Sequence, residues 1–302
     1  MRFHAKRADD VSVEDRPWYA PEAAIAGTLG RLNPATLLGK AFITLDRPWA
    51  GLVSPDIETV KRIARKMVGV HREDLGDVKV RIGGTSVLDD IGRAWSRTPW
   101  PLKPVLAGAS GLTSLTTNFS RSDHYNPFSH TVNLFSDHPE ISRHELGHAA
   151  DFGGVGNRWL RTLYAASGLI DSALPLPVTK LVAELRANQR AMQSTDTEQE
   201  RRNFLRLAVP GFSTYAAAAA APFIPDRWTE RLGAGAADFL KLRGSASRTG
   251  AVAVPKALLV SLTAPLASRG ALELYFAVKD MLASRKGKGK GKGKGKGDGG
   301  DD

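Results

Sequence analysis

Apolar side chains recur at helical spacing in several stretches of the chain. In residues 54–70 they form one stripe along a helix face, with Ser54 placed to cap the helix and Pro55 in its first turn. This stripe consists of Ile57, Val60, Ile63, Ala64, Met67 and Val68. The same kind of pattern predicts further helices over residues 177–193, 197–209, 225–242 and 271–283.

Three other stretches are typical of strands. Residues 77–84 alternate Val78, Val80 and Ile82 with charged side chains, which predicts a half-buried strand. We expect two more strands, over residues 111–119 and 130–136. Because the strands are inserted among helices and do not alternate with them, the predicted fold class is α+β with helices dominant.

A further helix is expected directly after the last of these strands. Asp137 and Glu140 are three residues apart, as in an aspartate version of a capping box, and Pro139 fits the first helical turn. The glycine-rich segment 152–157 should end this helix.

Composition divides the chain into three parts. Residues 1–50 are rich in proline and glycine and are interpreted as an N-terminal arm with one or two short helices. Residues 51–284 carry the periodic stretches and form the predicted folded domain. Residues 285–302 are mainly alternating glycine and lysine, which cannot bury a core, so we expect a disordered tail.

Positive charge is in surplus along the chain. The net charge is +11 over 302 residues, and the segment 285–302, with seven basic and three acidic residues, contributes +4 of it. The remaining +7 favours anionic partners or an anionic membrane surface. No recognised nucleic-acid-binding motif is present, so we expect no specific nucleic acid as a partner.

Cysteine is absent, and this limits both the chemistry and the expected location. A bound metal must use nitrogen and oxygen ligands. A chain without cysteine suits a reducing compartment, so we expect a cytoplasmic location. No run of about 20 apolar residues is long enough to span a membrane, and peripheral membrane contact is the alternative.

The segment 142–151, SRHELGHAAD, contains the pattern His-Glu-x-x-His. Residues four apart lie on the same face of a helix, so His144 and His148 can both bind one metal ion. Glu145 points to the side of that ion, where it can accept a proton from a water molecule that attacks a carbonyl group. The pattern therefore predicts a zinc site with a general base.

A catalytic zinc ion needs a third protein ligand, and two carboxylates compete for this role. Asp151 lies one turn after His148, but a straight helix carries it away from the ion, so we expect it to orient a histidine instead. Glu184 stands on a separate predicted helix and can approach from across a cleft. Asn188 lies on the same helix face as Glu184 and is expected to support a metal ligand. Ala187 and Ala191 would allow the two helices to pack closely.

HELGH followed by Glu-x-x-Ala-Asn-x-x-Ala resembles the gluzincin metallopeptidases, most of all the branch of membrane-bound CAAX-processing and heat-shock zinc peptidases. The run YNPFSHTVNLFSDHPEISRHELGHAADF is also similar to a little-characterised group of predicted zinc peptidases. The resemblance covers roughly residues 124–216, including Thr214 and Tyr215. It implies a zincin-like fold and zinc-dependent peptide hydrolysis. The CAAX-processing branch usually has aspartate where this chain has Asn188.

Other polar residues near the motif are candidates for stabilising negative charge in the transition state. His124, Tyr125, His130 or Tyr215 could each donate a hydrogen bond to an oxyanion. In zincin-like folds the strand before the motif helix is the edge strand that holds an extended substrate, and residues 130–135 occupy that place.

The sequence thus predicts a zinc metallopeptidase that acts on a peptide or protein substrate. The alternative hypothesis is a non-catalytic interaction protein supported by zinc and associated with a membrane. An intact Glu145 favours the enzyme, because a purely structural site needs no base.

Overall fold

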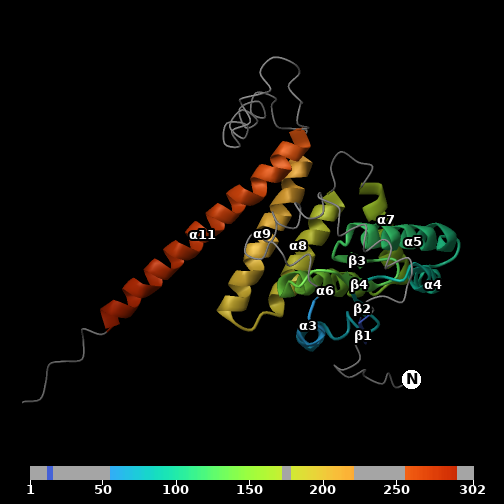
Figure 1. The fold of residues 1–302 in the computed structure, drawn as a ribbon, viewed down its shortest axis with the longest axis horizontal. Coiled ribbons are helices and arrows are strands. Elements are labelled where there is room, and N and C mark those ends of the chain that lie inside the picture. Colours follow the sequence, from blue (N-terminus) through green and yellow to red (C-terminus); the bar gives the residue numbers. More distant parts are fainter. Residues whose placement is uncertain (1–11, 16–54, 172–177, 221–255, 291–302) are drawn as a thin grey trace, which may run out of the picture.

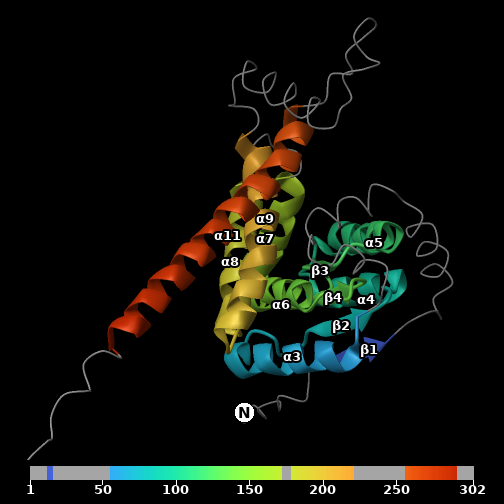
Figure 2. The ribbon, with the colours of Figure 1, turned by 60° about the vertical axis from the view of Figure 1, so that its left-hand side comes forward.

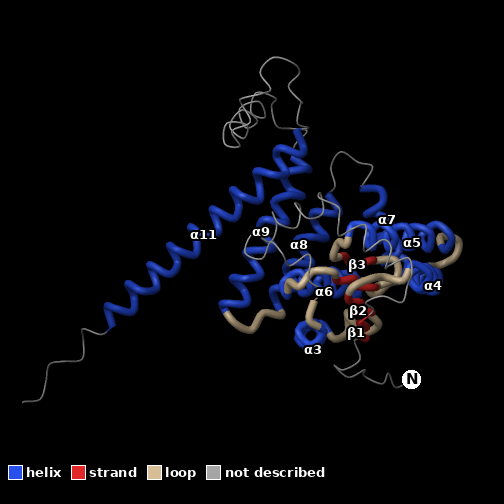
Figure 3. Tube along the Cα trace, viewed as in Figure 1, coloured by secondary structure: helices blue, strands red, loops and turns tan. Residues whose placement is uncertain are grey.

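The computed structural model describes residues 12–15, 55–171, 178–220 and 256–290. Over these ranges, helices dominate and surround one small mixed sheet, so the α+β, helix-dominant prediction is confirmed (Figures 1 and 3). The strands are β1 (Ser12–Asp15), β2 (Lys79–Ile82), β3 (His124–Asn126) and β4 (Thr131–Leu134). The first of them belongs to the predicted N-terminal arm, which therefore contributes a strand to the folded domain.

The strands lie in the order β1-β2-β4-β3. β1, β2 and β4 run parallel, and β3 is antiparallel to β4 at the edge of the sheet. The prediction that residues 130–135 form the edge strand is wrong, because β4 is hydrogen-bonded on both sides. The edge is formed instead by β3, a strand of three residues.

The two faces of the sheet differ in chemistry. Val80 of β2 is the register partner of Val132 of β4, and the apolar residues of this face pack against α3 (Ile57–His71) and α6 (Pro139–Gly153). The apolar stripe expected in residues 54–70 forms this contact. Helix α3 begins later than expected: its cap is Asp56, whose carboxylate accepts from the Thr59 amide at 2.8 Å.

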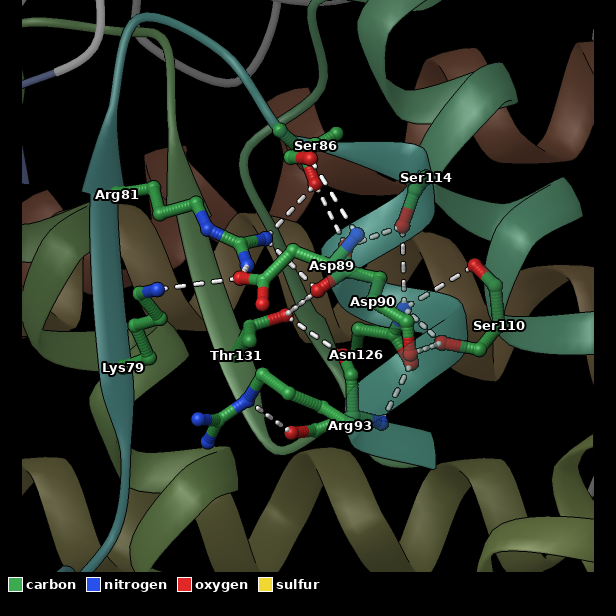
Figure 4. A network of polar contacts seen from close by, with 12 residues as sticks. Lys79, Arg81, Ser86, Asp89, Asp90, Arg93, Ser110, Ser114, Asn126 and Thr131 are labelled. Atoms are coloured by element: carbon green, nitrogen blue, oxygen red, sulfur yellow. Dashed lines mark hydrogen bonds and ion pairs between the residues drawn. The ribbon is translucent and has the colours of Figure 1, made fainter. Parts of the chain in front are cut away.

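The other face of the sheet is polar and packs on α4 (Val87–Arg97) and α5 (Lys103–Ser120). Its centre is the fully buried carboxylate of Asp90 (Figure 4). This group accepts hydrogen bonds from Arg81 at 2.7 Å, Thr85 at 2.6 Å and Thr131 at 3.1 Å, and a fourth from Ser114. A buried charge is stable only when it is paired and hydrogen-bonded in this way.

Helix α5 replaces the strand that we predicted over residues 111–119. Its buried residues recur at helical spacing and, apart from Leu106, are small or polar: Ala107, Ser110, Gly111, Ser114, Thr117 and Asn118. A Cβ atom on Gly111 would lie 2.8 Å from the Ile91 side chain, so glycine permits the close packing of α5 on α4. Leu112 and Leu115 of this segment are exposed.

The remaining described helices stand beside the sheet and its covering helices (Figures 1 and 2). They are α7 (Arg158–Asp171), α8 (Val178–Gln193), α9 (Glu198–Ala220) and α11 (Lys256–Lys290). Helix α8 packs on α6, and α11 packs along α9. Pro210 inside α9 has no N–H for the Arg206 carbonyl, and Arg269 of α11 donates to that carbonyl at 2.7 Å.

Helix α11 extends through Lys290, six residues into the segment predicted to be a disordered tail. Residues 291–302, and the helix predicted over 225–242, lie outside the described part of the chain. None of the helices in the described ranges has the length and apolar character needed to cross a bilayer.

Candidate metal centre

Two helices that pack unusually closely form the candidate site. A Cβ atom on Gly147 of α6 would lie 2.3 Å from the carbonyl oxygen of Ala187 of α8, so only glycine fits at this contact. Ala187 and Ala191 are both fully buried, in keeping with the close packing expected from the sequence. The polar residues of α6 and α8 are thereby brought to one place.

His144, His148 and Glu184 meet across this helix contact. The Nε2 atoms of the two histidines are 3.2 Å apart, and Glu184 Oε2 lies 3.2 Å from His144 Nε2 and 3.4 Å from His148 Nε2. Bonds of about 2.0–2.1 Å at tetrahedral angles would place ligand atoms about 3.3 Å apart. The three atoms therefore have the separation that one zinc ion requires.

Asn188 fixes the orientation of the first histidine. Its side-chain oxygen lies 2.8 Å from Nδ1 of His144, so Nδ1 carries the proton and donates to it. Nε2 of His144 is then left with the lone pair that a metal needs. Two histidines and one carboxylate also suit zinc by ligand type. Within the described ranges, this is the single group of three such residues with converging ligand atoms.

The pKa values of His144 and Glu184 depend on each other. Burial alone would lower the pKa of His144, but the hydrogen bond and negative charge of Glu184 raise that pKa to about 9. Burial alone would raise the pKa of Glu184, but the charge of His148 and the hydrogen bonds from both histidines hold it well below its usual range. Metal binding at these residues must therefore release a proton, as is usual for histidine sites.

Glu145 lies beside the group and is not one of its members. Its carboxylate is buried, and burial raises its pKa despite the nearby charges of His144 and His148. A carboxylate with a raised pKa is better suited to accept and return a proton near neutral pH.

Two cavities meet at the candidate centre, and Asp123, His144, Glu145, Glu184 and Tyr215 line both. One has a volume of about 340 Å³. It is walled by apolar residues of α6 and α9: Ile141, Leu207, Ala208 and Phe212. The other has a volume of about 400 Å³ and contains more polar groups, among them His124 and Lys180. The group is thus accessible from two sides.

Asp151 does not orient a histidine as predicted. Its carboxylate accepts from the Tyr164 hydroxyl at 3.0 Å and lies 2.7 Å from Nε of Arg186. These contacts tie α6 to α7 and α8, so Asp151 holds together the helices that carry the candidate site. The predicted capping box is also absent: His138 is the N-cap of α6, and Asp137 lies before it.

The four candidate oxyanion donors fall into two pairs. Tyr125 and His130 are buried and hydrogen-bonded to each other, with 2.6 Å between the hydroxyl and Nδ1, and Tyr125 also lines the polar cavity. His124 lines the polar cavity, and among the described residues its Nε2 has no hydrogen-bond partner. Tyr215 lines both cavities, and the negative charge of Glu184, together with burial, raises its pKa above the usual range.

Asp123 is a site residue that the sequence did not reveal. Its carboxylate accepts from the backbone amides of Phe135 at 2.6 Å and Ser136 at 2.9 Å, and from the Ser136 hydroxyl. It thereby holds the connection between β4 and α6 at the edge of both cavities. An isolated aspartate before a strand carries no local signal of such a role.

Comparisons with protein-family models, with curated proteins and with solved structures found no match to this chain. The resemblance to gluzincin peptidases therefore stays a prediction. The arrangement of the residues carries the functional argument.

Proposed function

We propose that this protein is a zinc-dependent metallopeptidase. The observation that carries the proposal is the triangle of His144, His148 and Glu184 ligand atoms, with the buried Glu145 carboxylate beside it and cavities on two sides. A bound zinc ion would supply Lewis-acid polarisation of a carbonyl group and activation of water.

The residues around the centre have separate roles in this proposal. Glu145 accepts a proton from the attacking water and returns it to the leaving amine. Asn188 keeps His144 in the tautomer that binds metal. His124 and Tyr215 face the cavities and are the donors best placed to stabilise negative charge on the substrate oxygen.

The β3 edge of the sheet is the proposed place for the substrate chain. Among the described strands, β3 pairs with β4 alone, and its first residue, His124, lines the same cavity as His148. An extended peptide that added to this edge would pass the candidate centre. The proposed substrates are therefore peptides or protein segments in an extended conformation.

The alternative is a zinc site that only supports the fold of an interaction protein. Structural zinc sites are normally closed by four protein ligands. Among the described residues this group has three, and the histidine side chains keep 18% and 17% of their surface exposed. An accessible, incomplete ligand set beside a buried carboxylate favours catalysis.

The test compares three forms of the protein for zinc content and for cleavage of a peptide library. Glu145→Gln should keep near-normal zinc content and lose most hydrolysis, since Glu145 is a base and not a ligand. Glu184→Ala should lose tight zinc binding as well as hydrolysis. Zinc binding by the wild type without any cleavage would support the interaction protein, and full activity of Glu145→Gln would exclude the proposed mechanism.

A further inference from the structure

A third cavity, of about 250 Å³, lies next to the polar cavity of the candidate centre. The two share four wall residues: Pro127, Phe128, Phe152 and Ala165. Three arginines, Arg97, Arg158 and Arg161, line the third cavity, and its lining contains no aspartate or glutamate. Positive charge is therefore concentrated here without a carboxylate in the wall.

Backbone carbonyl groups hold two of these arginines in place. Arg158 donates from Nε to the Arg97 carbonyl at 2.6 Å and from Nη2 to the carbonyls of Ser96 and Thr98, at 2.8 and 2.9 Å. Arg161 donates from Nε and Nη2 to the Val155 carbonyl, at 3.1 and 3.0 Å. Hydrogen bonds along one edge of each guanidinium group, from Nε and Nη2, thus hold both side chains in place.

The charge of these two side chains is not neutralised within the described ranges. Arg97 is paired with Asp77, but neither Arg158 nor Arg161 has an ion pair with a described carboxylate. Their Nη1 atoms make no hydrogen bond within those ranges. Burial lowers the pKa of Arg97, and the positive charges of Arg161 and Arg158 lower it further.

We propose that this cavity binds an oxyanion, the chemistry that a phosphate and a carboxylate share. An anion between the guanidinium groups would relieve their repulsion, and the planar arginine fork suits two-point contact with such oxygens. Thr98 and Thr162 add hydroxyl groups to the same wall. The proposal goes beyond the proposed hydrolysis and does not depend on zinc.

Two sources could supply the oxyanion. One is free phosphate, which would make the cavity an effector site. The other is the carboxylate end of a peptide bound in the neighbouring cavity, which shares Phe128 and Phe152 with this one. Both sources require the same arginines, so one set of variants tests both.

Calorimetry of the full-length protein would measure the binding of sodium phosphate, with sodium chloride at equal ionic strength as the blank. A second arm would compare a short peptide with a free C-terminal carboxylate and the same peptide as its amide. We expect saturable binding in at least one arm, weakened tenfold or more by Arg158→Gln with Arg161→Gln. Arg65→Gln, which removes an exposed arginine on α3, should leave binding unchanged.

A second measurement avoids reliance on variants, because Arg158 and Arg161 also support the backbone. Phenylglyoxal modification of the wild-type protein, resolved by mass spectrometry, should be slowed at these arginines by the bound anion and unchanged at Arg65. Two results would overturn the proposal. They are no binding and no protection from either anion, or binding that Arg65→Gln weakens as much as the double variant.

Discussion

Asn188 contributes to the candidate site through one contact, with Nδ1 of His144 at 2.8 Å. We expect Asn188→Ala to lower zinc affinity by about 10–100-fold, because loss of such a support leaves the ligand free to turn or change tautomer. Asn188→Asp should keep the acceptor and preserve affinity. Competition with a chromophoric chelator would measure both values.

Asp151 is the control residue for the Asn188 prediction. Its carboxylate contacts Tyr164 and Arg186, so Asp151→Ala should alter zinc affinity less than Asn188→Ala does. If Asp151→Ala had the larger effect, Asn188 would not be the residue that orients the ligand.

The contact between α6 and α8 leads to a prediction at the scale of elements. Gly147→Ala would place a methyl group 2.3 Å from the Ala187 carbonyl oxygen and force the helices apart. We expect a loss of about 1–3 kcal/mol in the free energy of unfolding, together with weaker zinc binding, because Glu184 moves with α8. Urea unfolding of the zinc-free protein and a zinc titration would measure the two effects.

Gly108 of α5 provides the control for this substitution. A Cβ atom there would meet no atom within 4 Å, and Gly108→Ala should raise helix stability by about 0.5–1 kcal/mol. A Gly147→Ala protein as stable as the wild type would show that the helices do not need their close approach.

Helix α9 forms the apolar cavity wall and contributes Gly211 to it. A side chain there would start in open space, since nothing lies within 4 Å of its Cβ position. If the proposed function is right, Gly211→Leu should slow cleavage of peptides with large apolar residues more than that of peptides with small ones. Zinc content should stay unchanged. Equal slowing of both peptide sets would show that this cavity does not receive a substrate side chain.

Local patterns in the sequence predicted the elements whose buried faces are apolar. α3 shows such a pattern. β2 and α8 were predicted as well, but β2 is buried on both faces, with Arg81 on the polar one, and the buried residues of α8 include Glu184 and Asn188. Helix α5 was missed because it buries Ser110, Ser114 and Asn118, whose hydrogen-bond partners come from distant parts of the chain. The short strands β1 and β3 owe their existence to pairing across the sheet and leave no local signal.

The candidate site also contains some residues that a local sequence pattern reveals and others that depend on distant parts of the chain. His144, Glu145 and His148 are recognisable from spacing on one helix, and Glu184 from its place on a second helix with small neighbours. The partners of Asp151 and the backbone contacts of Asp123 depend on which helices and loops become neighbours. No spacing rule along the chain contains that information.

At the scale of the whole molecule, the candidate ligands join separate helices, so metal binding should stabilise the entire fold. With free zinc at about 100 times its dissociation constant, the free energy of unfolding should rise by about 2.7 kcal/mol. The melting temperature should fall when a chelator removes the metal. Scanning calorimetry with zinc and with chelator would measure the difference.

Two variants separate this effect from general stability. Glu184→Gln should remove the zinc-dependent increment. Ser114→Ala, which deletes one donor to the buried Asp90 carboxylate, should cost about 1–3 kcal/mol with and without zinc and keep the increment. An equal zinc increment in the Glu184→Gln protein would show that the metal binds elsewhere.

The hydrogen bond from Arg269 to the Arg206 carbonyl has a consequence for the order in which the molecule is completed. A chain emerging from the ribosome contains all three candidate ligands once residue 184 has been made. Helix α9, which walls the apolar cavity, is synthesised next, and its Arg206 carbonyl gains its partner only when residue 269 has been made. The centre can thus gather its ligands early, while the cavity beside it takes its final form near the end of translation.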